Sequence, residues 1–451
     1  MKNFSEYNSI FFVGVGGISM SALAKLMIFN KKKVFGYDAD SSDITMELRS
    51  LGAKISNDSN CRNLYLCDLL CFSGAIKDND AHIQLAKKLG IECVERSTFL
   101  GKISEKYSHV IAVAGSHGKT TTTAMLGYIF LLAGKQPTVH VGGQFNQLGG
   151  NVYIGKNDFF ITEACEFRDS FLSLHPEVAV VTNIEREHLD YFKNYDNEIK
   201  SFEQFCNQSS NLVINGHYSN LVCCNSSVKV QTFSKGAYIA KNITQKDGKY
   251  SFDAYKKGNI IGHFDVGIVG EYNVYNSLAV ISVCDYFGID YQHVHEGLWT
   301  FQNGSRRMEV VGSYSSNLVV SDYAHHPTEI CATIKACKQA FNKKIVCVFQ
   351  PHTYSRTQSL FDDFLSCFDE VEELYLLPTY PAREDYNYLG SSTRLGEKFK
   401  HNQSFCFRGV VDKNNLIDKI NHAQYKDFLI LFLGAGDIDL LPRALVLDKT
   451  V

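Results

Sequence analysis

The sequence predicts an α/β protein of three domains, each built around a parallel sheet. At 451 residues the chain is too long for one hydrophobic core. Short apolar strands alternate with segments of helical spacing, which is the pattern of parallel strands covered by helices on both faces. This alternation begins afresh three times along the chain. We therefore expect domains at residues 1–105, 106–302 and 303–451.

The first domain is predicted from five segments. A glycine turn follows the first strand directly, and Gly90 closes the last helix. The strands are expected within 9–17, 32–40 and 68–76, and the helices within 18–30 and 81–90. A strand that runs through a glycine turn into a helix is typical of a dinucleotide-type, Rossmann-like domain.

The other two domains show the same alternation of strands and helices. The central one starts with the strand in "HVIAVAGSHGKT", and the third starts near "NGSRRMEVVG" as a second Rossmann-like domain. A helix at 327–341 has proline in its first turn. Polar alternation and the "DG" and "KKGN" turns at 242–266 predict hairpins on the central domain. Further strands of the third domain are expected at 317–324, 343–351, 372–380 and 428–436.

The composition of the chain limits which partners and which cellular compartment we expect. Hydrophobic residues make up 45% and charged residues 21%, with a net charge of -3. No strongly basic surface is implied, so we expect no nucleic-acid partner. No apolar run is long enough to span a bilayer, and the N-terminus does not have the pattern of a signal peptide. The 14 cysteines are scattered and lack zinc-type spacing, which favours reduced thiols in a cytoplasmic protein without a membrane partner.

The start of the central domain is a shortened phosphate-binding loop. The usual G-x-x-x-x-G-K-[ST] pattern needs glycine where Val113 stands, whereas this loop runs Gly115, Ser116, His117, Gly118, Lys119, Thr120 and Thr121. Backbone N–H groups of such a loop and the following helix N-terminus favour a polyphosphate. Lys119 is expected to reach the terminal phosphates, and the hydroxyl of Thr120 to bind magnesium. A P-loop type of nucleotide domain is therefore predicted.

Two later strands place polar residues at their carboxyl ends. Glu163 ends the strand in "DFFITEACE", and His188 follows a strand in "PEVAVVTNIE" that is expected to end near Ile184. Ligands of open parallel sheets bind outside the carboxyl ends of the strands. Lys119, Thr120, Glu163 and His188 together predict a magnesium–ATP site. Taken alone, His188 is more often a hydrogen-bonded loop histidine than a magnesium ligand.

The glycine turn of the first domain carries an imperfect dinucleotide fingerprint. Gly14 and Gly16 fit the pattern, Ser19 replaces its final glycine, and Asp38 stands near the expected acidic position. From these residues alone NAD binding is a fair prediction, and an NAD-dependent dehydrogenase is one alternative function. That alternative leaves the Gly-Lys-Thr loop unexplained.

Seven segments distributed over all three domains resemble the Mur ligases. They are "AGSHGKTTTT", "EACEFRDSFL", "VVTNIEREHLDYF", "GEYNVYNSLAV", "SRRMEVVG", "SDYAHHPTE" and "FQPHTYSRT". The resemblance runs from Phe11 to about Ile438. The Gly-Lys-Thr-Thr loop is shared with folylpolyglutamate synthases, but "FVGVGGISMS", "DYAHHPTE" and "FQPHTYSRT" are much more specific.

The resemblance implies a role for the predicted site residues. The shortened loop is the family's own form, so Val113 is not a defect. Lys119 is implied to contact the ATP phosphates, Thr120 and Glu163 to hold one magnesium ion, and Glu163 and His188 to hold a second. The nucleotide contacts implied farther along the chain are Asn273 and Asn276 on the adenine side and Arg307 and Asp322 over the phosphates and ribose.

The resemblance also reassigns the glycine turn to a UDP-sugar. Gly14, Gly16, Gly17 and Ser19 would receive its diphosphate, and Ser73 would add a contact. Asp38 either contacts the uridine side or only caps a turn. His352 and Arg356 are implied substrate contacts, although a structural histidine and a surface arginine are the simpler interpretation. The glycines Gly142 and Gly143 are expected to shape the channel to ATP.

The implied reaction is the ATP-dependent ligation of L-alanine to the lactyl carboxylate of UDP-N-acetylmuramate through an acyl phosphate, in peptidoglycan precursor synthesis. A monomer or weak homodimer is expected. Two alternatives stay open: a ligase that attaches a preformed tripeptide during cell-wall recycling, and a nucleotide-binding protein without ligase activity. The short connection from Arg168 to Pro176 favours L-alanine. Arg168 departs from the family pattern, and it either pairs with the substrate or is a surface cation.

Overall fold

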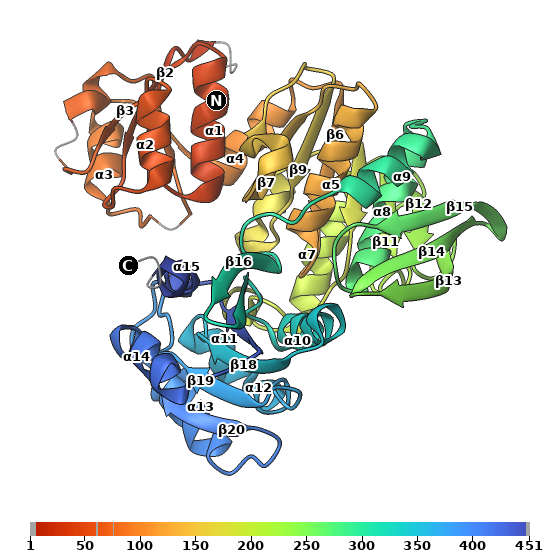
Figure 1. The fold of residues 1–451 in the computed structure, drawn as a ribbon. Helices are drawn as coiled ribbons and strands as arrows, with labels where there is room; N and C mark the ends of the chain where they lie inside the picture. The colour runs from red at the N-terminus through yellow and green to blue at the C-terminus, as the bar shows by residue number, and fades with distance from the viewer. Residues whose placement is uncertain (1–5, 60–61, 75, 448–451) are drawn as a thin grey trace. The chain divides into compact units, whose positions relative to one another are not determined.

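The computed structural model describes residues 6–59, 62–74 and 76–447. The chain divides into two units with three sheets (Figure 1). The first unit comprises Met1–Glu185, Ile199–Tyr238 and Ala279–Gly297, and the second comprises Arg186–Glu198, Ile239–Leu278 and Leu298–Val451. Within the described residues, no helix has the length and apolar content that a membrane crossing requires.

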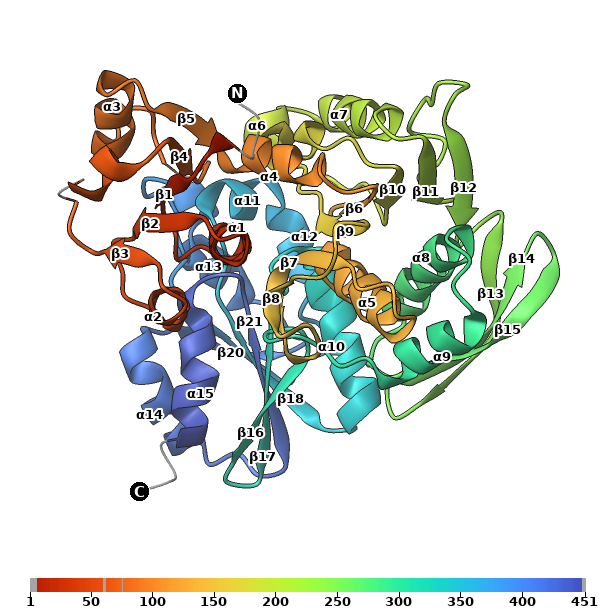
Figure 2. The ribbon, with the colours of Figure 1, turned by 90° about the horizontal axis from the view of Figure 1, so that it is seen from above.

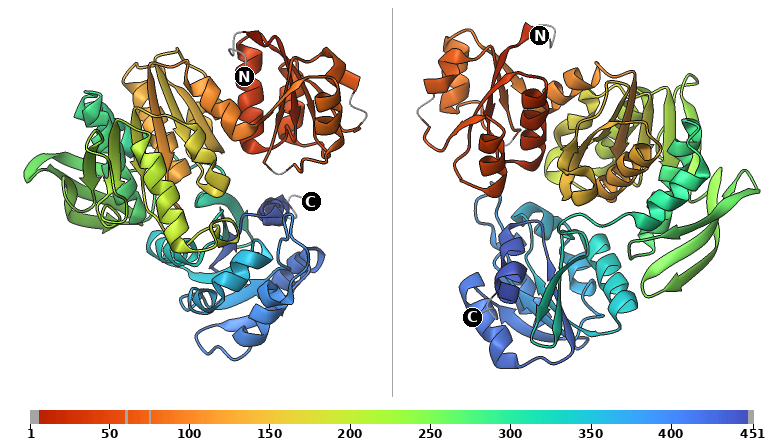
Figure 3. Two further views of the ribbon diagram at one scale, coloured as in Figure 1. Left: turned by 180° about the vertical axis from the view of Figure 1, so that it is seen from behind. Right: turned by 45° about the horizontal axis from the view of Figure 1, so that its top comes forward.

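The first sheet is fully parallel, with strand order β3-β2-β1-β4-β5. Successive residues of β1 point to opposite faces, as the period of a strand requires. Phe11 stacks on His82 of α3, whereas Phe12 meets Phe99 of α4 edge to face. Helices accordingly lie on both sides of this sheet (Figure 3). The elements are β1 (Ser9–Val13), α1 (Ile18–Phe29), β2 (Lys33–Tyr37), α2 (Asp43–Ser50), β3 (Lys54–Ser56), η2 (Arg62–Leu66), β4 (Leu69–Phe72), α3 (Ala81–Lys88), β5 (Glu92–Glu95) and α4 (Arg96–Ser104).

In the second sheet, which has ten strands, those of the first unit follow the order β12-β11-β10-β6-β9-β7-β8. Its pairs are parallel except for β7 with β8. The strands β6 and β10 are rich in buried valine, isoleucine and alanine, and β9 is buried at its three central residues, as expected for central strands. The elements are β6 (His109–Ala114), α5 (Lys119–Leu132), β7 (Thr138–Phe145), η3 (Asn146–Leu148), β8 (Gly150–Tyr153), β9 (Phe159–Glu163), η4 (Phe167–Ser173), β10 (Val178–Val181), α7 (Tyr195–Asn207), β11 (Asn211–Asn215) and β12 (Lys229–Phe233).

The second unit contains a strand meander and a mixed sheet. The meander is β13 (Tyr238–Lys246), β14 (Lys249–Lys256) and β15 (Asn259–Val266), with β14 and β15 antiparallel. The six-stranded sheet has the order β16-β17-β21-β18-β19-β20, and only β16 runs antiparallel to its neighbour. Its strands are β16 (Glu309–Tyr314), β17 (Asn317–Asp322), β18 (Lys344–Phe349), β19 (Glu373–Leu376), β20 (Cys406–Val410) and β21 (Phe428–Leu433).

Helices cover both faces of the six-stranded sheet (Figure 2). One apolar core lies between the sheet and α10, α12 and α13, and another lies between the sheet and α14 and α15. The remaining elements of this unit, or shared with the first, are α6 (Leu189–Phe192), α8 (Tyr272–Tyr286), α9 (Tyr291–Thr300), α10 (Pro327–Phe341), α11 (Tyr354–Ser359), α12 (Phe361–Ser366), η5 (Tyr388–Gly390), α13 (Ser392–Phe399), α14 (Lys413–Ala423), η6 (Asp437–Asp439) and α15 (Leu440–Leu447).

The predicted α/β fold is confirmed, with differences in detail. The sheets are not entirely parallel, because β8 and β16 pair antiparallel at their edges. The strand expected to end near Ile184 ends at Val181, after which the side chains of Thr182 and Asn183 bond His117 of the phosphate-type loop. The predicted hairpins at 242–266 are present. The boundaries at 105/106 and 302/303 stay predictions.

Candidate active site

The loop from Gly115 to Gly118 connects β6 with α5. Gly115 has φ +133°, and a Cβ atom there would lie 2.1 Å from Oγ1 of Thr182. Gly118 has φ +83° in the left-handed region and is the N-cap of α5. Only glycine adopts such backbone at low cost, so both glycines are needed for the loop to reach the helix. The predicted helix start at Lys119 is confirmed.

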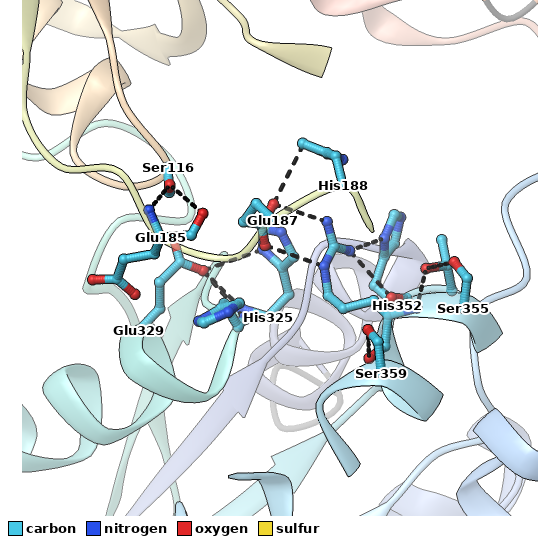
Figure 4. Close-up of polar contacts among 12 residues, drawn as sticks. Ser116, Glu185, Glu187, His188, His325, Glu329, His352, Ser355 and Ser359 are labelled. Carbon is cyan, nitrogen blue, oxygen red and sulfur yellow. Dashed lines mark hydrogen bonds and ion pairs between the residues drawn. The ribbon is translucent and has the colours of Figure 1, made fainter. Parts of the chain in front are cut away.

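The segment after β10 holds this loop in place. The amide N–H of His117 donates to Oδ1 of Asn183 at 2.8 Å, and Nδ2 of Asn183 donates to the carbonyl of His117 at 2.9 Å. The backbone N–H of Glu185 donates to Oγ of Ser116 at 2.8 Å (Figure 4). Imidazole Nε2 of His117 also lies 3.3 Å from the Glu185 carboxylate. The "TNIE" segment therefore shapes the loop, a role that sequence reasoning did not assign to Asn183.

Lys119 is directed into the loop. Its Nζ donates to the carbonyls of Gly115 and Ser116, the latter at 3.1 Å, and to Glu166 at 3.0 Å. Glu166 is only 1% exposed. A buried carboxylate beside a lysine holds the ammonium at a defined place at the helix N-terminus. Glu166 was missed from the sequence, although it is the second acidic residue of the "EACE" segment.

Thr120 and Glu163 both border the glycines of β7. A Cβ atom on Gly142 would lie 2.7 Å from Oε2 of Glu163, and one on Gly143 would lie 3.2 Å from Cγ2 of Thr120. The N–H of Gly142 also donates to the Glu163 carboxylate. A hydroxyl and a carboxylate are oxygen ligands of the kind that magnesium prefers, and the missing side chains of β7 leave room beside them. These residues therefore fit a magnesium ion.

A charged cluster follows in the second unit. Nε of Arg356 lies 3.3 Å from Oε1 of Glu187, and its NH2 lies 3.3 Å from Oε2, a bidentate pair (Figure 4). NH1 of Arg356 lies 3.2 Å from Nδ1 of His352, and Nε2 of His188 lies 3.3 Å from Glu187. Of the predicted residues, His188 and Arg356 therefore contact Glu187, which sequence reasoning did not single out, and His352 contacts Arg356. Arg356 is largely buried at 12% exposure, so it is not a surface cation.

Two histidines of this cluster are held neutral. Burial first, then the positive charge of Arg356, lowers the pKa of His325 to about 4. Burial, together with His325 and Arg356, lowers the pKa of His352 to about 3. The ring of His352 stacks on Tyr380 with centroids 5.5 Å apart. A neutral imidazole beside an arginine can accept a hydrogen bond, so His352 helps to fix the guanidinium.

Asp322 is the last residue of β17, and Arg307 lies just before β16. Oδ2 of Asp322 accepts from the N–H of Met308 at 2.7 Å, and Oδ1 accepts from the N–H of Ala324 at 2.8 Å. Burial raises the pKa of Asp322, although Arg307 and these N–H groups act in the opposite direction. Asp322 therefore ties the residue before β16 to the end of β17 in this structure. The ribose contact implied for it stays a prediction.

The two predicted adenine-side asparagines are buried together on α8. Nδ2 of Asn276 donates to Oδ1 of Asn273 at 3.0 Å, and Nδ2 of Asn273 donates to the carbonyl of Val269 at 2.7 Å. The pair thereby fixes the first turn of α8 to the segment before it.

In the first domain the glycine turn contacts Asp38. Oδ2 of Asp38 accepts from the N–H of Gly16 at 2.7 Å, and a Cβ atom on Gly16 would approach that oxygen to 2.9 Å. Asp38 therefore makes the predicted turn contact, and its contact with the uridine side stays a prediction. Ser73 lies beside Gly14, where an added Cβ would be 3.6 Å from that of Ser73. Gly17 is the N-cap of α1.

Arg168 contacts the same region of the first unit. Its NH1 donates to the carbonyl of Gly74 at 2.9 Å, so it joins η4 to the loop after β4. Both Arg168 and Asp169 have positive φ, which marks a kink within η4. The alternatives for Arg168, substrate contact or surface cation, are not decided by this bond.

Three α/β domains, with a shortened phosphate-type loop in the middle one, define a class of ATP-dependent ligases, and the chain belongs to the Mur ligase family. The profile "Mur ligase family, catalytic domain" matches residues 9–108, "Mur ligase middle domain" matches 113–284, and "Mur ligase, glutamate ligase domain" matches 306–436.

Full-length relatives point to one branch of this family. A UDP-N-acetylmuramate–L-alanine ligase of Caldanaerobacter subterraneus subsp. tengcongensis is 39% identical over 449 residues, covering 96% of each chain. The crystal structure of a UDP-N-acetylmuramate–alanine ligase from Thermotoga maritima has a TM-score of 0.83 at 27% identity and covers 98% of both chains. A murein peptide ligase from Psychrobacter arcticus has a TM-score of 0.74 at 20% identity, covering 98% of this chain and 99% of its own, which is a likeness of fold.

Proposed function

We propose that this chain joins L-alanine to UDP-N-acetylmuramate with hydrolysis of ATP to ADP and phosphate. The observation that carries the proposal is the match to L-alanine ligases along the whole chain, 39% identical over 96% of it. The phosphate-type loop and Glu163, which ends the neighbouring strand β9, support it with the chemistry that the reaction needs.

The proposed reaction has two steps. A lactyl carboxylate oxygen attacks the γ-phosphorus of ATP, the bond to the β,γ-bridging oxygen breaks, and ADP leaves an acyl phosphate behind. The amine of L-alanine then attacks the acyl carbon, phosphate leaves and one proton is released. A carboxylate and a triphosphate repel each other, so catalysis consists mainly of positioning and charge stabilisation. We assign the phosphate contact to the ammonium of Lys119, with the loop from Gly115 to Thr121 around it.

Magnesium supplies the remaining positive charge in this proposal. Thr120 and Glu163 would hold one ion, and Glu163 and His188 a second. The N–H of Gly142 helps to orient the Glu163 carboxylate for this role. Glu166 positions Lys119 rather than contacting substrate.

The other predicted residues complete the substrate contacts. The turn of Gly14, Gly16, Gly17 and Ser19 would receive the sugar-nucleotide diphosphate at the N-terminus of α1, with Ser73 alongside. In the second unit, the proposal assigns Asn273 and Asn276 to the adenine side, Arg307 and Asp322 to the phosphates and ribose, and His352 and Arg356 to the substrate.

The choice of L-alanine over a preformed tripeptide rests on the relatives and on a short connection. Between β9 and β10 the chain forms only the short helix η4, which leaves little wall for a long peptide. A pocket discriminates between amines that differ by a methyl or a hydroxyl group by only about 1–3 kcal/mol of transition-state binding free energy. Glycine and L-serine are therefore expected as poor substitutes for L-alanine.

A turnover assay tests the proposal. Phosphate release should require both UDP-N-acetylmuramate and L-alanine, and the UDP product should gain the mass of one alanine residue. With L-alanine and the tripeptide in competition, a dominant tripeptide adduct would reassign the amine while the ligase chemistry stands. Phosphate release without either substrate would favour a nucleotide-binding ATPase, and reduction of NAD would favour a dehydrogenase.

Location and assembly follow from the same proposal. ATP is a substrate, so we also propose that the chain works in the cytoplasm, where ATP is made. A monomer or weak homodimer is expected, and sedimentation at micromolar and higher concentrations measures it.

A further inference from the structure

A partly buried hydrogen-bond chain connects the N-terminus of α1 with the residue that precedes Glu163. NH1 of Arg96 lies 3.2 Å from Oγ of Ser19, and Oγ of Ser19 lies 2.9 Å from Nε2 of His140. Nδ1 of His140 lies 3.0 Å from Oγ1 of Thr162, which lies 3.0 Å from the carbonyl oxygen of Glu163. Thr162 is fully buried, and His140 is 3% exposed.

The register of the sheet brings the chain together. His140 on β7 pairs with Thr162 on β9, and α1 packs against β7. Ser19 is the residue that takes the place of the last glycine of the dinucleotide fingerprint, where glycine serves close packing. The hydroxyl that Ser19 has in place of this glycine hydrogen-bonds with His140.

The directions of these bonds are consistent with one another. Guanidinium NH1 of Arg96 can only donate, so the Ser19 hydroxyl accepts from it and keeps its own hydrogen available to donate to Nε2 of His140. If the hydroxyl of Thr162 donates to the Glu163 carbonyl, it accepts from Nδ1–H of His140. Every donor then has an acceptor with a neutral imidazole in the Nδ1–H form. Burial, followed by Arg96, lowers the pKa of His140 to about 3, which agrees with a neutral ring.

We propose that Arg96, Ser19, His140 and Thr162 form a positioning relay that fixes the backbone at Glu163 from the glycine turn of the first domain. The relay makes the orientation of the proposed magnesium ligand depend on the helix that receives the sugar nucleotide. His140 is a positioning residue, because it acts through Thr162 and touches no reactant. The inference rests on the proposed function, since it takes Glu163 as the magnesium ligand.

Spectroscopy tests the bond directions without turnover. In the full-length chain labelled with ¹⁵N-histidine, long-range ¹H–¹⁵N correlation at neutral pH identifies the tautomer of each ring. The His140 signal is assigned by its loss in His140→Leu, or in His140→Asn should the leucine variant not fold. The relay requires the Nδ1–H form. An Nε2–H form or an imidazolium would overturn it.

Calorimetric binding of a non-hydrolysable magnesium–ATP analogue tests the effect on the site. Thr162→Val keeps the shape of the side chain and breaks the relay, and it should weaken binding about tenfold, as partners of metal ligands commonly do. His140→Leu should do the same. His140→Asn, which retains an N–H in the place of Nδ1, should recover most of the affinity. Ser19→Gly combined with His140→Leu should be no weaker than His140→Leu alone.

Lys25→Met is the matched control for packing between α1 and the central sheet. Nζ of Lys25 donates to Oδ1 of Asn151 on β8 at 3.1 Å, a contact with no connection to Glu163. This variant should bind the analogue within twofold of the unaltered chain. The relay would be overturned if Lys25→Met weakened binding of the analogue as much as Thr162→Val does. It would also be overturned if Thr162→Val and His140→Leu both kept full affinity for the analogue. If the unaltered chain binds the analogue but forms no product, the proposed function fails while these binding comparisons still decide the relay. If it does not bind the analogue, both fail.

Discussion

At the scale of single residues, the loop lysine depends on a carboxylate that the motif does not contain. Lys119 belongs to the recognisable Gly-Lys-Thr pattern, whereas Glu166 lies 47 positions farther along the chain and reaches it only through the fold. The pair keeps an ammonium at the N-terminus of α5. A charge held in place in advance stabilises a transition state without reorganisation.

Lys119→Ala should lower ligation on the order of a hundredfold or more, because it removes the charge proposed to act on the γ-phosphate. UDP-N-acetylmuramate should still bind, since the glycine turn lies in another domain. Phosphate release and calorimetry measure the two effects. Lys102→Ala, an exposed lysine of the same unit, is the control and should retain both. Loss of sugar-nucleotide binding in a folded Lys119→Ala would contradict the assignment.

His352 is expected to make the stability of the fold decrease as the pH is lowered. Its pKa is lowered to about 3 in the folded state by burial and by His325 and Arg356, against about 6.5 when unfolded. Between these values the unfolded chain binds more protons, so stability falls as the pH is lowered through 6.5, by up to about 1.4 kcal/mol per pH unit. The Tm of wild type should therefore drop more between pH 7 and pH 5 than that of His352→Asn. Parallel profiles would contradict a neutral, buried His352.

At the scale of elements, strand β7 both borders the proposed magnesium ligands and pairs with the edge strand β8. Its glycines leave space for Thr120 and Glu163, and its antiparallel partner β8 is joined to it through η3. A glycine inside a strand usually marks a close approach of other groups. Here that approach is made by a carboxylate.

Gly142→Ala should displace the Glu163 carboxylate, because the new Cβ would lie 2.7 Å from Oε2. We expect magnesium-dependent turnover to fall at least tenfold and the magnesium requirement to rise, as for disturbed metal surroundings in general. Gly262→Ala on β15, whose Cβ would meet only Phe264 at 3.1 Å, is the strand-glycine control. An unchanged magnesium titration in Gly142→Ala would show that Glu163 is not the ligand.

Helix α10 begins with a capping box. The side chain of His326 accepts from the N–H of Thr328, and Glu329 accepts from the N–H of His326. Pro327 occupies the first turn, as the sequence predicted. His326→Ala should lower stability by about 1 kcal/mol through loss of the cap, and His326→Asn, which can cap, should recover much of it. Thermal unfolding compares them; equal Tm values for all three chains would show that the cap contributes nothing.

At the scale of the whole molecule, the proposed site residues are divided between the two units. Lys119, Thr120 and Glu163 belong to the first, whereas His188, Arg307 and Asp322 belong to the second. The proposed reaction uses both groups of residues, so we predict that the dimensions of the chain change when substrates bind.

Small-angle scattering tests this prediction. The radius of gyration is expected to decrease when an ATP analogue and UDP-N-acetylmuramate are present together, compared with the free chain and with each ligand alone. An identical radius in all four states would argue that the site needs no closure.

The sequence by itself determined the fold class, most strands and helices, and the family. Those features are written in local patterns: the apolar strands β6, β9 and β10, the Gly-Lys-Thr loop, and the proline at the start of α10. Periodicity and turn chemistry act over a few residues, so they can be recognised without a partner.

Only the tertiary structure decided which side chains meet. The bonds of Lys119 with Glu166, of Arg356 with Glu187 and of Ser19 with His140 join residues 47, 169 and 121 positions apart. The antiparallel edges at β8 and β16 were also missed, because an edge strand carries the same apolar alternation whichever way it runs. Contacts of this kind depend on strand order and register, which the chain acquires only when its sheets assemble.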